Sequence, residues 1–140
     1  MLHNPVEVPP TLPERPRTEP AVVFSGTLAE KKGVRQLIRA WPAVAAACRG
    51  AKLHIYGKDG RTESGESMMA VLGRELGGAR ESVEFHSHVT QDALFTALES
   101  ARAAIFPSYA EAFALAPLEA MAHGCPTIYS RRGSGPEVIR

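Results

Sequence analysis

The sequence predicts an α/β fold built on a Rossmann-like, doubly wound parallel sheet, and three observations support this prediction. Short apolar, β-favouring runs alternate with longer segments whose apolar residues recur at helical spacing. Glycine or proline follows most of these runs, where the chain must turn. The length of 140 residues suits one domain with a single sizeable core.

The expected strands are the apolar runs at 21–25, 52–56, 82–86, 103–106 and 126–129. The expected helices are the periodic segments between them: one from Val34 to about Ala45, one from Met68 to Gly77, one capped by Thr90, and one with Pro117 in its first turn and Gly124 at its end. Pro42 is expected to kink or interrupt the first of these helices.

Residues 1–20 are predicted to form an extended interdomain linker. They contain six prolines among charged residues, a composition that builds neither a helix nor a sheet ladder. The domain boundary is therefore expected at residue 20, and residues 21–140 are expected to form the folded domain.

Composition excludes several classes of function. A net charge of +1 and few aromatic residues give no reason to expect nucleic-acid binding. No apolar run approaches the length of a membrane span and no signal-peptide core begins the chain, so a cytoplasmic location is predicted. Cys48 and Cys125 stand alone in apolar segments and are expected to be buried free thiols. His86 and His88 have no third ligand near them in sequence, so no metal site is predicted.

Two acidic residues mark the candidate site. Glu111 falls in the loop after the strand at 103–106, and Glu119 is expected in the first turn of the next helix. Ligands bind at this edge of open α/β sheets, and the backbone N–H groups of residues 113–115 could take phosphate oxygens while a carboxylate binds a sugar diol. The alternative is that Glu119 serves only to complement the helix dipole.

These residues carry a family resemblance. Glu111 and Glu119 are separated by seven residues, with Phe113 after the first, Pro-Leu-Glu-Ala-Met-Ala around the second and Gly-Cys-Pro next. This pattern resembles the C-terminal half of the retaining glycosyltransferases of family 4, which have the GT-B fold, and further similarities extend over 21–139. The resemblance implies that Glu111 contacts the donor sugar and that Glu119 holds the ribose hydroxyls of the nucleotide.

The first strand and its turn are similar to the same family. There, Gly-Arg-Leu is followed by Lys-Gly, and the Arg and Lys clamp the donor diphosphate. Gly26, Lys32 and Gly33 agree with this pattern, but Thr27 stands at the Arg position. Because threonine cannot offer a charged, bidentate fork, either affinity falls or another cation substitutes. Without the resemblance, Lys32 would be taken for a solvated surface lysine.

Three further positions bear on the resemblance. His88 and Val89 follow a strand whose loop faces the nucleotide base in relatives, although an ordinary surface loop is the alternative. Ala112 and Ala114 stand where relatives have glycine, and they would strain the loop if those positions need positive φ. Residues 131–139 are similar to the family's Gly-Gly-x-Pro-Glu loop.

The resemblance implies the donor-binding half of a glycosyltransferase that moves a hexose from a nucleoside diphosphate sugar to a glycan or lipid-linked acceptor, as in polysaccharide biosynthesis. Lys32 and the backbone N–H groups of Phe113, Ala114 and Leu115 would bind the diphosphate, without a metal or another cofactor. The acceptor site would lie in an absent N-terminal domain, so the isolated chain should be almost inactive. Any membrane contact would be peripheral and would involve absent parts.

Two alternatives remain at this point: a non-catalytic nucleotide- or partner-binding domain, suggested by Thr27, Ala112 and Ala114, and a sugar-nucleotide epimerase of the same fold, whose paired-glutamate spacing fits less well. The domain is also expected to lack its last elements. An uncovered sheet edge would then favour self-association of the chain.

Overall fold

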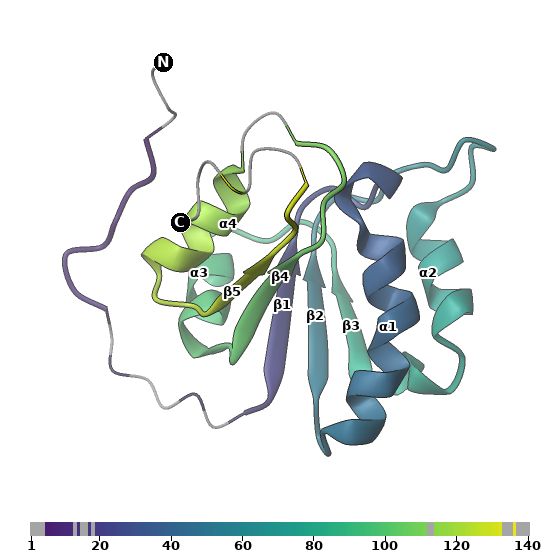
Figure 1. The fold of residues 1–140 in the computed structure, drawn as a ribbon, viewed down its shortest axis with the longest axis horizontal. Coiled ribbons are helices and arrows are strands. Elements are labelled where there is room, and N and C mark those ends of the chain that lie inside the picture. The colour runs from purple at the N-terminus through teal and green to yellow at the C-terminus, as the bar shows by residue number, and fades with distance from the viewer. Residues whose placement is uncertain are drawn as a thin grey trace.

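A computed structural model gives the structure of residues 5–12, 14, 17, 19–111, 114–132 and 136. Its centre is a five-stranded parallel sheet with strand order β3-β2-β1-β4-β5 (Figure 1). The strands are β1 (Ala21–Ser25), β2 (Lys52–Tyr56), β3 (Val83–His86), β4 (Ala103–Phe106) and β5 (Thr127–Tyr129). The predicted Rossmann-like, doubly wound architecture is confirmed, because the strand order reverses direction after β3.

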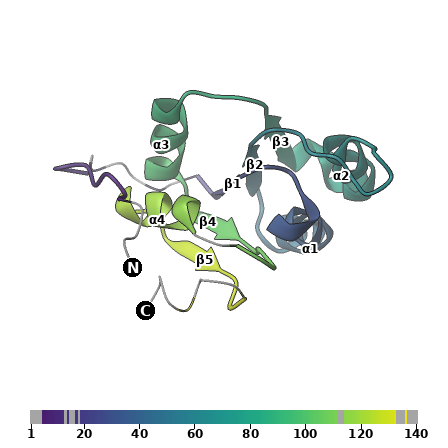
Figure 2. The same cartoon turned by 90° about the horizontal axis from the view of Figure 1, so that it is seen from above.

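Four α-helices and two short 3-10 segments connect the strands: η1 (Glu30–Lys32), α1 (Val34–Ala47), α2 (Met68–Leu76), η2 (Gly77–Ser82), α3 (Gln91–Ser100) and α4 (Leu115–Ala122). Helices α1 and α2 cover one face of the sheet, and α3 and α4 lie on the other (Figure 2). None of the helices in the described ranges is long and apolar enough to cross a membrane.

Local sequence explains the ends of these helices. The Thr90 hydroxyl accepts a hydrogen bond from the backbone N–H of Ala93 at 3.2 Å, which confirms the predicted N-cap of α3. Ser67 caps α2 in the same way. The C-terminus of α4 is followed by Gly124, whose φ of +69° is the left-handed conformation that commonly ends a helix.

Two features of the first half differ from expectation. Of the two outcomes expected for Pro42, a kink or an interruption, the interruption does not occur, because α1 runs through Pro42 as one helix. A proline removes one N–H donor from a helix, and the four buried residues that precede it on α1 offset this loss by packing in the core. Cys48 lies beyond the end of α1 and is exposed, whereas Cys125 is buried as predicted; both thiols are free.

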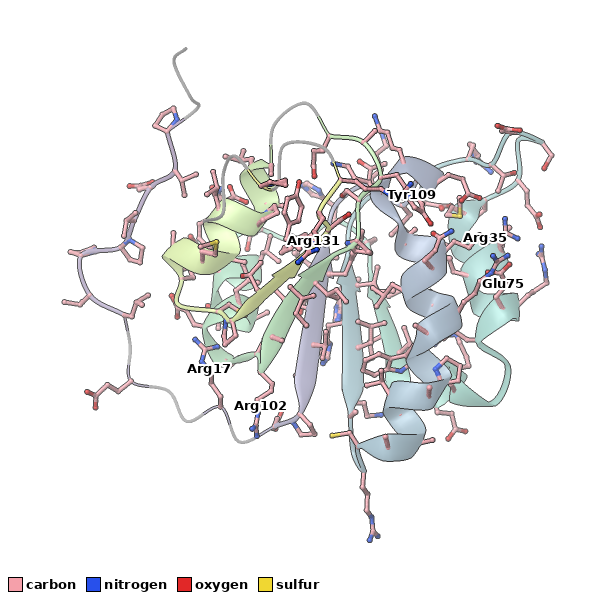
Figure 3. The ribbon with its side chains drawn as sticks, viewed as in Figure 1. Arg17, Arg35, Glu75, Arg102, Tyr109 and Arg131 are labelled. Carbon is pink, nitrogen blue, oxygen red and sulfur yellow. The ribbon has the colours of Figure 1, made fainter. Side chains whose placement is uncertain are left out.

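The sheet separates two hydrophobic cores of different character. The larger lies under α1 and α2 and is built from bulky side chains, among them Phe24, Leu28, Ile38, Trp41, Leu53, Ile55 and Leu72. The smaller lies under α3 and α4 and consists of Val23, Leu98, Ala101, Ala104, Phe106, Ala120 and Cys125. An ion pair adds to the first side, because the Arg35 guanidinium reaches the Glu75 carboxylate at 2.6 Å between α1 and α2 (Figure 3).

The described residues before β1 contain no helix or strand, and one side chain ties them to the sheet and its helices. The Arg17 guanidinium donates hydrogen bonds to the backbone carbonyls of Leu98 at 3.1 Å, Ala101 at 2.5 Å and Gly124 at 2.6 Å. These carbonyls lie at the C-terminal ends of α3 and α4, where a cation also complements the helix dipoles. Arg17 therefore fastens this segment beneath the second half of the sheet.

Candidate functional site

The candidate site lies at the carboxyl edge of the sheet, where the loops after the parallel strands gather (Figure 1). Two loops are brought together there by Gly33, which has a φ of +69°. A Cβ atom on Gly33 would lie 2.0 Å from the Pro107 carbonyl oxygen. The close approach is reinforced nearby by a hydrogen bond of 2.8 Å from the Tyr109 N–H to the Lys31 carbonyl. The start of α1 is thus packed directly against the loop that follows β4.

This packing places Lys32 beside Glu111. The Lys32 ammonium donates a hydrogen bond to Oε1 of Glu111 and forms an ion pair with it. The Tyr129 hydroxyl, at the end of β5, donates to Oε2 of the same carboxylate at 3.2 Å. The Glu111 side chain is only 10% exposed. The carboxylate is consequently held in one orientation by side chains from η1 and from the end of β5.

The N-terminus of helix α4 could bind an anion through its backbone N–H groups. Its first residue is Leu115, and within the described residues no side chain caps this end of the helix. The N–H groups of Leu115 and Ala116 therefore lack the side-chain partner that a cap would give the first turn, while Pro117 has none to satisfy. The preceding residue, Ala114, is fully buried and has a φ of −90°. Alanine at this position needs no left-handed backbone, so it adds no strain.

The position of Glu119 within α4 differs from the prediction. Because α4 begins at Leu115, Glu119 is its fifth residue and belongs to the second turn, not the first. Burial raises the pKa of its carboxyl, while nearby His123 and a hydrogen bond from Gln91 oppose this effect. Gln91 is the first residue of α3, so Glu119 faces the α3 side of the site.

A pocket of about 260 Å³ occupies the neighbouring part of the same edge. Its lining comes from the ends of β1 and β2 and the loop after β3, and consists of Ser25, Gly26, Thr27, Tyr56, Gly57, Lys58, Ser87, His88, Val89 and Leu94. Gly26 has a φ of +149°, a conformation that favours glycine. A Cβ on Gly57 would lie 1.8 Å from the Gly26 carbonyl oxygen, so the two turns can approach this closely only because position 57 is glycine.

The pocket and Glu119 are linked through the start of α3. Val89 and Leu94 line the pocket, and Gln91, which bonds to Glu119, stands between them in the chain. The loop at His88 and Val89, expected to face a nucleotide base, thus contributes to this pocket and leads into the helix whose first residue bonds to Glu119.

The structure brings the predicted residues together in two groups. Lys32 and Glu111 are in direct contact, and Gly26 and Thr27 share the pocket wall. Ala114 and Leu115 mark the start of α4. Phe113, Ala112 and most of the predicted loop at 131–139 lie outside the described residues.

Sequence reasoning missed two residues of this site. Tyr129 holds Glu111, and its place at the end of a predicted strand was a usable signal. Lys58 lines the pocket opposite the Thr27 turn and belongs to a Gly-Lys-Asp-Gly segment that was treated only as a turn.

A comparison with known protein families covers nearly the whole chain. The family model described as "Glycosyl transferases group 1" matches residues 19–140. The chain belongs to the group 1 glycosyltransferases. The sequence resemblance to GT-B glycosyltransferases is therefore confirmed.

Several group 1 glycosyltransferases and related proteins resemble this chain. An uncharacterized glycosyltransferase of Methanocaldococcus jannaschii is 34% identical over 122 residues, which are 87% of this chain and 30% of that protein. Glycogen synthase of Mycobacterium tuberculosis is 34% identical over 131 residues, which are 93% of this chain and 30% of that enzyme. The chain thus spans about a third of the length of these relatives.

The fold is shared with solved glycosyltransferase structures. The C-terminal domain of a group 1 family glycosyl transferase from Francisella tularensis superposes with a TM-score of 0.74 at 20% identity, over 86% of this chain and 62% of that one. This likeness shows the fold alone. It confirms that the group 1 glycosyltransferase described here has the architecture of a GT-B C-terminal domain.

Proposed function

We propose that this chain is the donor-binding half of a retaining glycosyltransferase, and that it binds a nucleoside diphosphate sugar from which a hexose passes to a glycan or lipid-linked acceptor. The observation that carries the proposal is the contact of Lys32 with Glu111, which stands four residues before α4 begins at Leu115. A cation, a fixed carboxylate and free backbone N–H groups at one sheet edge are the groups that a sugar diphosphate needs.

Each group has a task in such a transfer. The bond between the anomeric carbon of the sugar and the diphosphate oxygen breaks, so negative charge grows on the leaving diphosphate. Lys32 and the N–H groups of Leu115 and Ala116 would stabilise that charge. Glu111, held by Tyr129, would orient the donor sugar, and Glu119 would bind the ribose hydroxyls. The Lys32 ammonium would then have to interact with both the Glu111 carboxylate and the diphosphate.

Lys58 is proposed as the cation that compensates for Thr27. The arginine expected from the family at position 27 is missing, but Lys58 lines the same pocket as Thr27. An ammonium group binds phosphate as a point charge even though it cannot form a bidentate fork. A donor phosphate in this pocket would therefore meet Lys58 where relatives present their arginine.

No metal is required for this transfer, because Lys32, Lys58 and the helix start supply the positive potential that a metal would otherwise provide. The acceptor site is proposed to lie in a separate N-terminal domain, as in GT-B enzymes, and the reaction is proposed to take place in the cytoplasm. This chain alone is then expected to bind nucleotide weakly and to turn over little or no donor.

One observation favours a second function, a non-catalytic nucleotide- or partner-binding domain. Thr27 removes a fixed charge from the pocket, as it would in a domain that had lost its clamp. The two functions differ in one measurement: a protein containing this domain and an intact N-terminal domain hydrolyses or transfers from a sugar nucleotide only if the first function is right. Ala114 was one of the residues that suggested the non-catalytic function, but its φ of −90° involves no left-handed strain, so it no longer supports that function.

Binding calorimetry with UDP, GDP and ADP tests the donor site. At least one diphosphate should bind, and Lys32→Ala should weaken it about 10- to 100-fold, since a hydrogen bond to a charged group contributes roughly 1.5–3 kcal/mol. Lys31→Ala is the matched control, because Lys31 is its exposed neighbour in the same 3-10 turn. Glu119→Ala should also weaken binding.

The outcomes are distinct. Absence of binding by all three nucleotides, or equal affinity in Lys32→Ala and Lys31→Ala, would refute the donor site. If Lys32→Ala weakens binding but Lys58→Ala does not, the donor site stands and the role given to Lys58 is wrong.

Self-association is proposed as a weaker property of the same chain. Strand β5 forms one edge of the described sheet, and its Ile128 side chain is 58% exposed. Light scattering at increasing concentration should show a rising mean mass. A strictly monomeric mass at high concentration would exclude this association.

A further inference from the structure

On the face of the sheet that carries α3 and α4, strands β2 and β3 present a cluster of three metal-ligating side chains. His54 lies on β2, and Glu84 and His86 lie on β3. His54 is directly opposite Glu84 in the parallel register, and His86 is opposite Tyr56. Because side chains alternate along a strand, all of these residues point to the same face, away from the core residues Leu53 and Ile55.

The ligand atoms are spaced as a metal would require. Nδ1 of His54 lies 3.0 Å from Nε2 of His86, and Oε2 of Glu84 lies 3.5 Å and 3.7 Å from these two nitrogens. In a tetrahedral zinc site with bonds of 2.0–2.1 Å, neighbouring ligand atoms are separated by roughly 3.3–3.4 Å. The three atoms therefore already form nearly one triangular face of a tetrahedron.

The cluster is also accessible and partly held in place. The side chains of His54, Glu84 and His86 are 23%, 54% and 28% exposed, so an ion can reach them and keep a water molecule in its fourth position. The His86 ring stacks on Tyr56 with centroids 4.3 Å apart and planes inclined by 8°. This stacking fixes the direction of one ligand before an ion arrives.

We propose that His54, Glu84 and His86 form a binding site for Zn²⁺ or a similar first-row divalent cation. Two imidazole nitrogens and one carboxylate oxygen are a ligand set that this class of metal prefers over Mg²⁺ or Ca²⁺. The site is separate from the Lys32–Glu111 pair and takes no part in the proposed transfer. A bound ion would instead cross-link β2 and β3 next to Tyr56, which lines the pocket.

The competing explanation is a simple hydrogen bond between two neutral imidazoles, one donating and the other accepting. Such a bond accounts for the 3.0 Å contact between the histidines. The Glu84 oxygen, within 3.7 Å of both nitrogens, would then make only an ordinary cross-strand contact between a carboxylate and the imidazoles. Metal titration separates the two explanations.

The test uses the 140-residue chain without an affinity tag. Isothermal titration with Zn²⁺ should show one site per chain, and Co²⁺ should give the visible absorption bands of a tetrahedral complex. His54→Gln and His86→Gln should each weaken Zn²⁺ binding about 100-fold or more, because even loss of a group that only orients a ligand costs 10- to 100-fold. Zn²⁺ should raise Tm in the unmodified protein and not in these variants.

His88→Ala is the matched control, since this exposed histidine lies two residues beyond His86 and outside the cluster. It should bind Zn²⁺ as the unmodified chain does. Circular dichroism checks that each glutamine variant is folded; if one is not, Glu84→Gln, on an exposed side chain, replaces it as the test. Absence of Zn²⁺ binding, or loss of binding in His88→Ala with retention in His54→Gln, would overturn the proposal. Either result leaves the donor-site experiment unaffected.

Discussion

The two halves of the sheet are stabilised in different ways. Strands β1, β2 and β3 with α1 and α2 surround the core of bulky side chains, and Arg35 and Glu75 join the two helices at their surface. Strands β4 and β5 with α3 and α4 surround a smaller core in which three of the seven buried residues are alanine. Burial of apolar area stabilises roughly in proportion to that area, so the first half contributes more of the stability.

The residues of the proposed donor site are distributed differently, because both halves contribute to it. Lys32 and Lys58 come from the first half, whereas both carboxylates, Glu111 and Glu119, the start of α4 and Tyr129 belong to the second. That half receives support from outside at two points: Gly33 packs against Pro107, and Arg17 binds the carbonyl ends of α3 and α4. We infer that the loop carrying Glu111 and the start of α4 are supported by the smaller core. Contacts from Gly33 and Arg17 add to that support.

The largest effect is expected in the first core. Trp41→Ala removes a side chain that is 1% exposed and donates a hydrogen bond of 2.8 Å from Nε1 to the Ser82 hydroxyl. The free energy of unfolding should fall by about 3–5 kcal/mol, as is typical of a large aromatic residue removed from a core. Chemical denaturation measures this change.

Two control variants test whether the large effect at Trp41 depends on its burial and on the core to which it belongs. Val44→Ala on the same helix, at a side chain that is 42% exposed, should change stability by less than about 0.5 kcal/mol. Cys125→Ala in the smaller core should cost only about 1 kcal/mol. If Cys125→Ala proved as costly as Trp41→Ala, the two cores would not differ as described.

The next effect concerns the junction of the two halves. Gly33→Ala would place a Cβ 2.0 Å from the Pro107 carbonyl oxygen in a left-handed backbone conformation. Strain and overlap together should cost about 2–4 kcal/mol and should also weaken nucleotide binding, since the loop carrying Glu111 must move. Gly73→Ala is the control: Gly73 lies inside α2 with open space around its Cβ position, and the change should stabilise by up to about 1 kcal/mol. Equal stability of the two variants in thermal unfolding would contradict the role of Gly33.

Arg17 tests whether the segment before the sheet supports the second half. Arg17→Ala removes hydrogen bonds from a charged group to three carbonyls, and a loss of about 1.5–3 kcal/mol is expected. Hydrogen exchange should increase in α3 and α4 more than in α1. Arg102→Ala serves as the control, because Arg102 is an exposed arginine in the turn just before β4 (Figure 3). Uniform acceleration of exchange across both halves would indicate that Arg17 supports the whole domain.

The sequence was sufficient to predict the fold because its signals are local. All five strands appear where apolar, β-favouring runs stand between turn residues, and β1, β2 and β4 have the predicted bounds. The ends of β3 and β5 differ by one residue each; Ser82, for example, belongs to η2 instead. The continuity of α1 through Pro42 and the exposure of Cys48 could not be predicted, because both depend on tertiary contacts that the local pattern does not contain.

The candidate site could be predicted only in part, for the same reason. Lys32 and Glu111 were identified through motif resemblance, and their contact follows from two loops 79 residues apart in the chain. The sequence pattern does not reveal that Tyr129 holds Glu111, that Lys58 shares a pocket with Thr27, or that His86 lies beside His54 and not His88. Each of these contacts depends on strand order and register, which periodicity alone does not specify.

The smallest expected effect is a gain in stability on replacing Glu119, because its buried charge destabilises the folded state at neutral pH. Burial raises the pKa of its carboxyl above the ordinary value of 4.5, so the folded state disfavours the charged form. Stability contributed by the protonated carboxyl is present below the ordinary pKa and is lost as pH rises through the raised one. Glu119→Gln keeps an amide able to bond to Gln91 but carries no charge. Its Tm should therefore exceed that of the unmodified chain slightly at neutral pH, and the difference should vanish below pH 4.5.

The same variant should bind nucleoside diphosphate more weakly, because an amide accepts fewer hydrogen bonds from a ribose diol than a carboxylate does. A gain in stability together with a loss of binding is expected where a buried charge is retained for function. His123 is buried and close to this carboxyl, so His123→Gln tests whether the neighbouring charge matters. If Glu119→Gln instead lowered Tm at neutral pH while leaving nucleotide affinity unchanged, Glu119 would be a structural residue of α4, and the second half would hold one functional carboxylate rather than two.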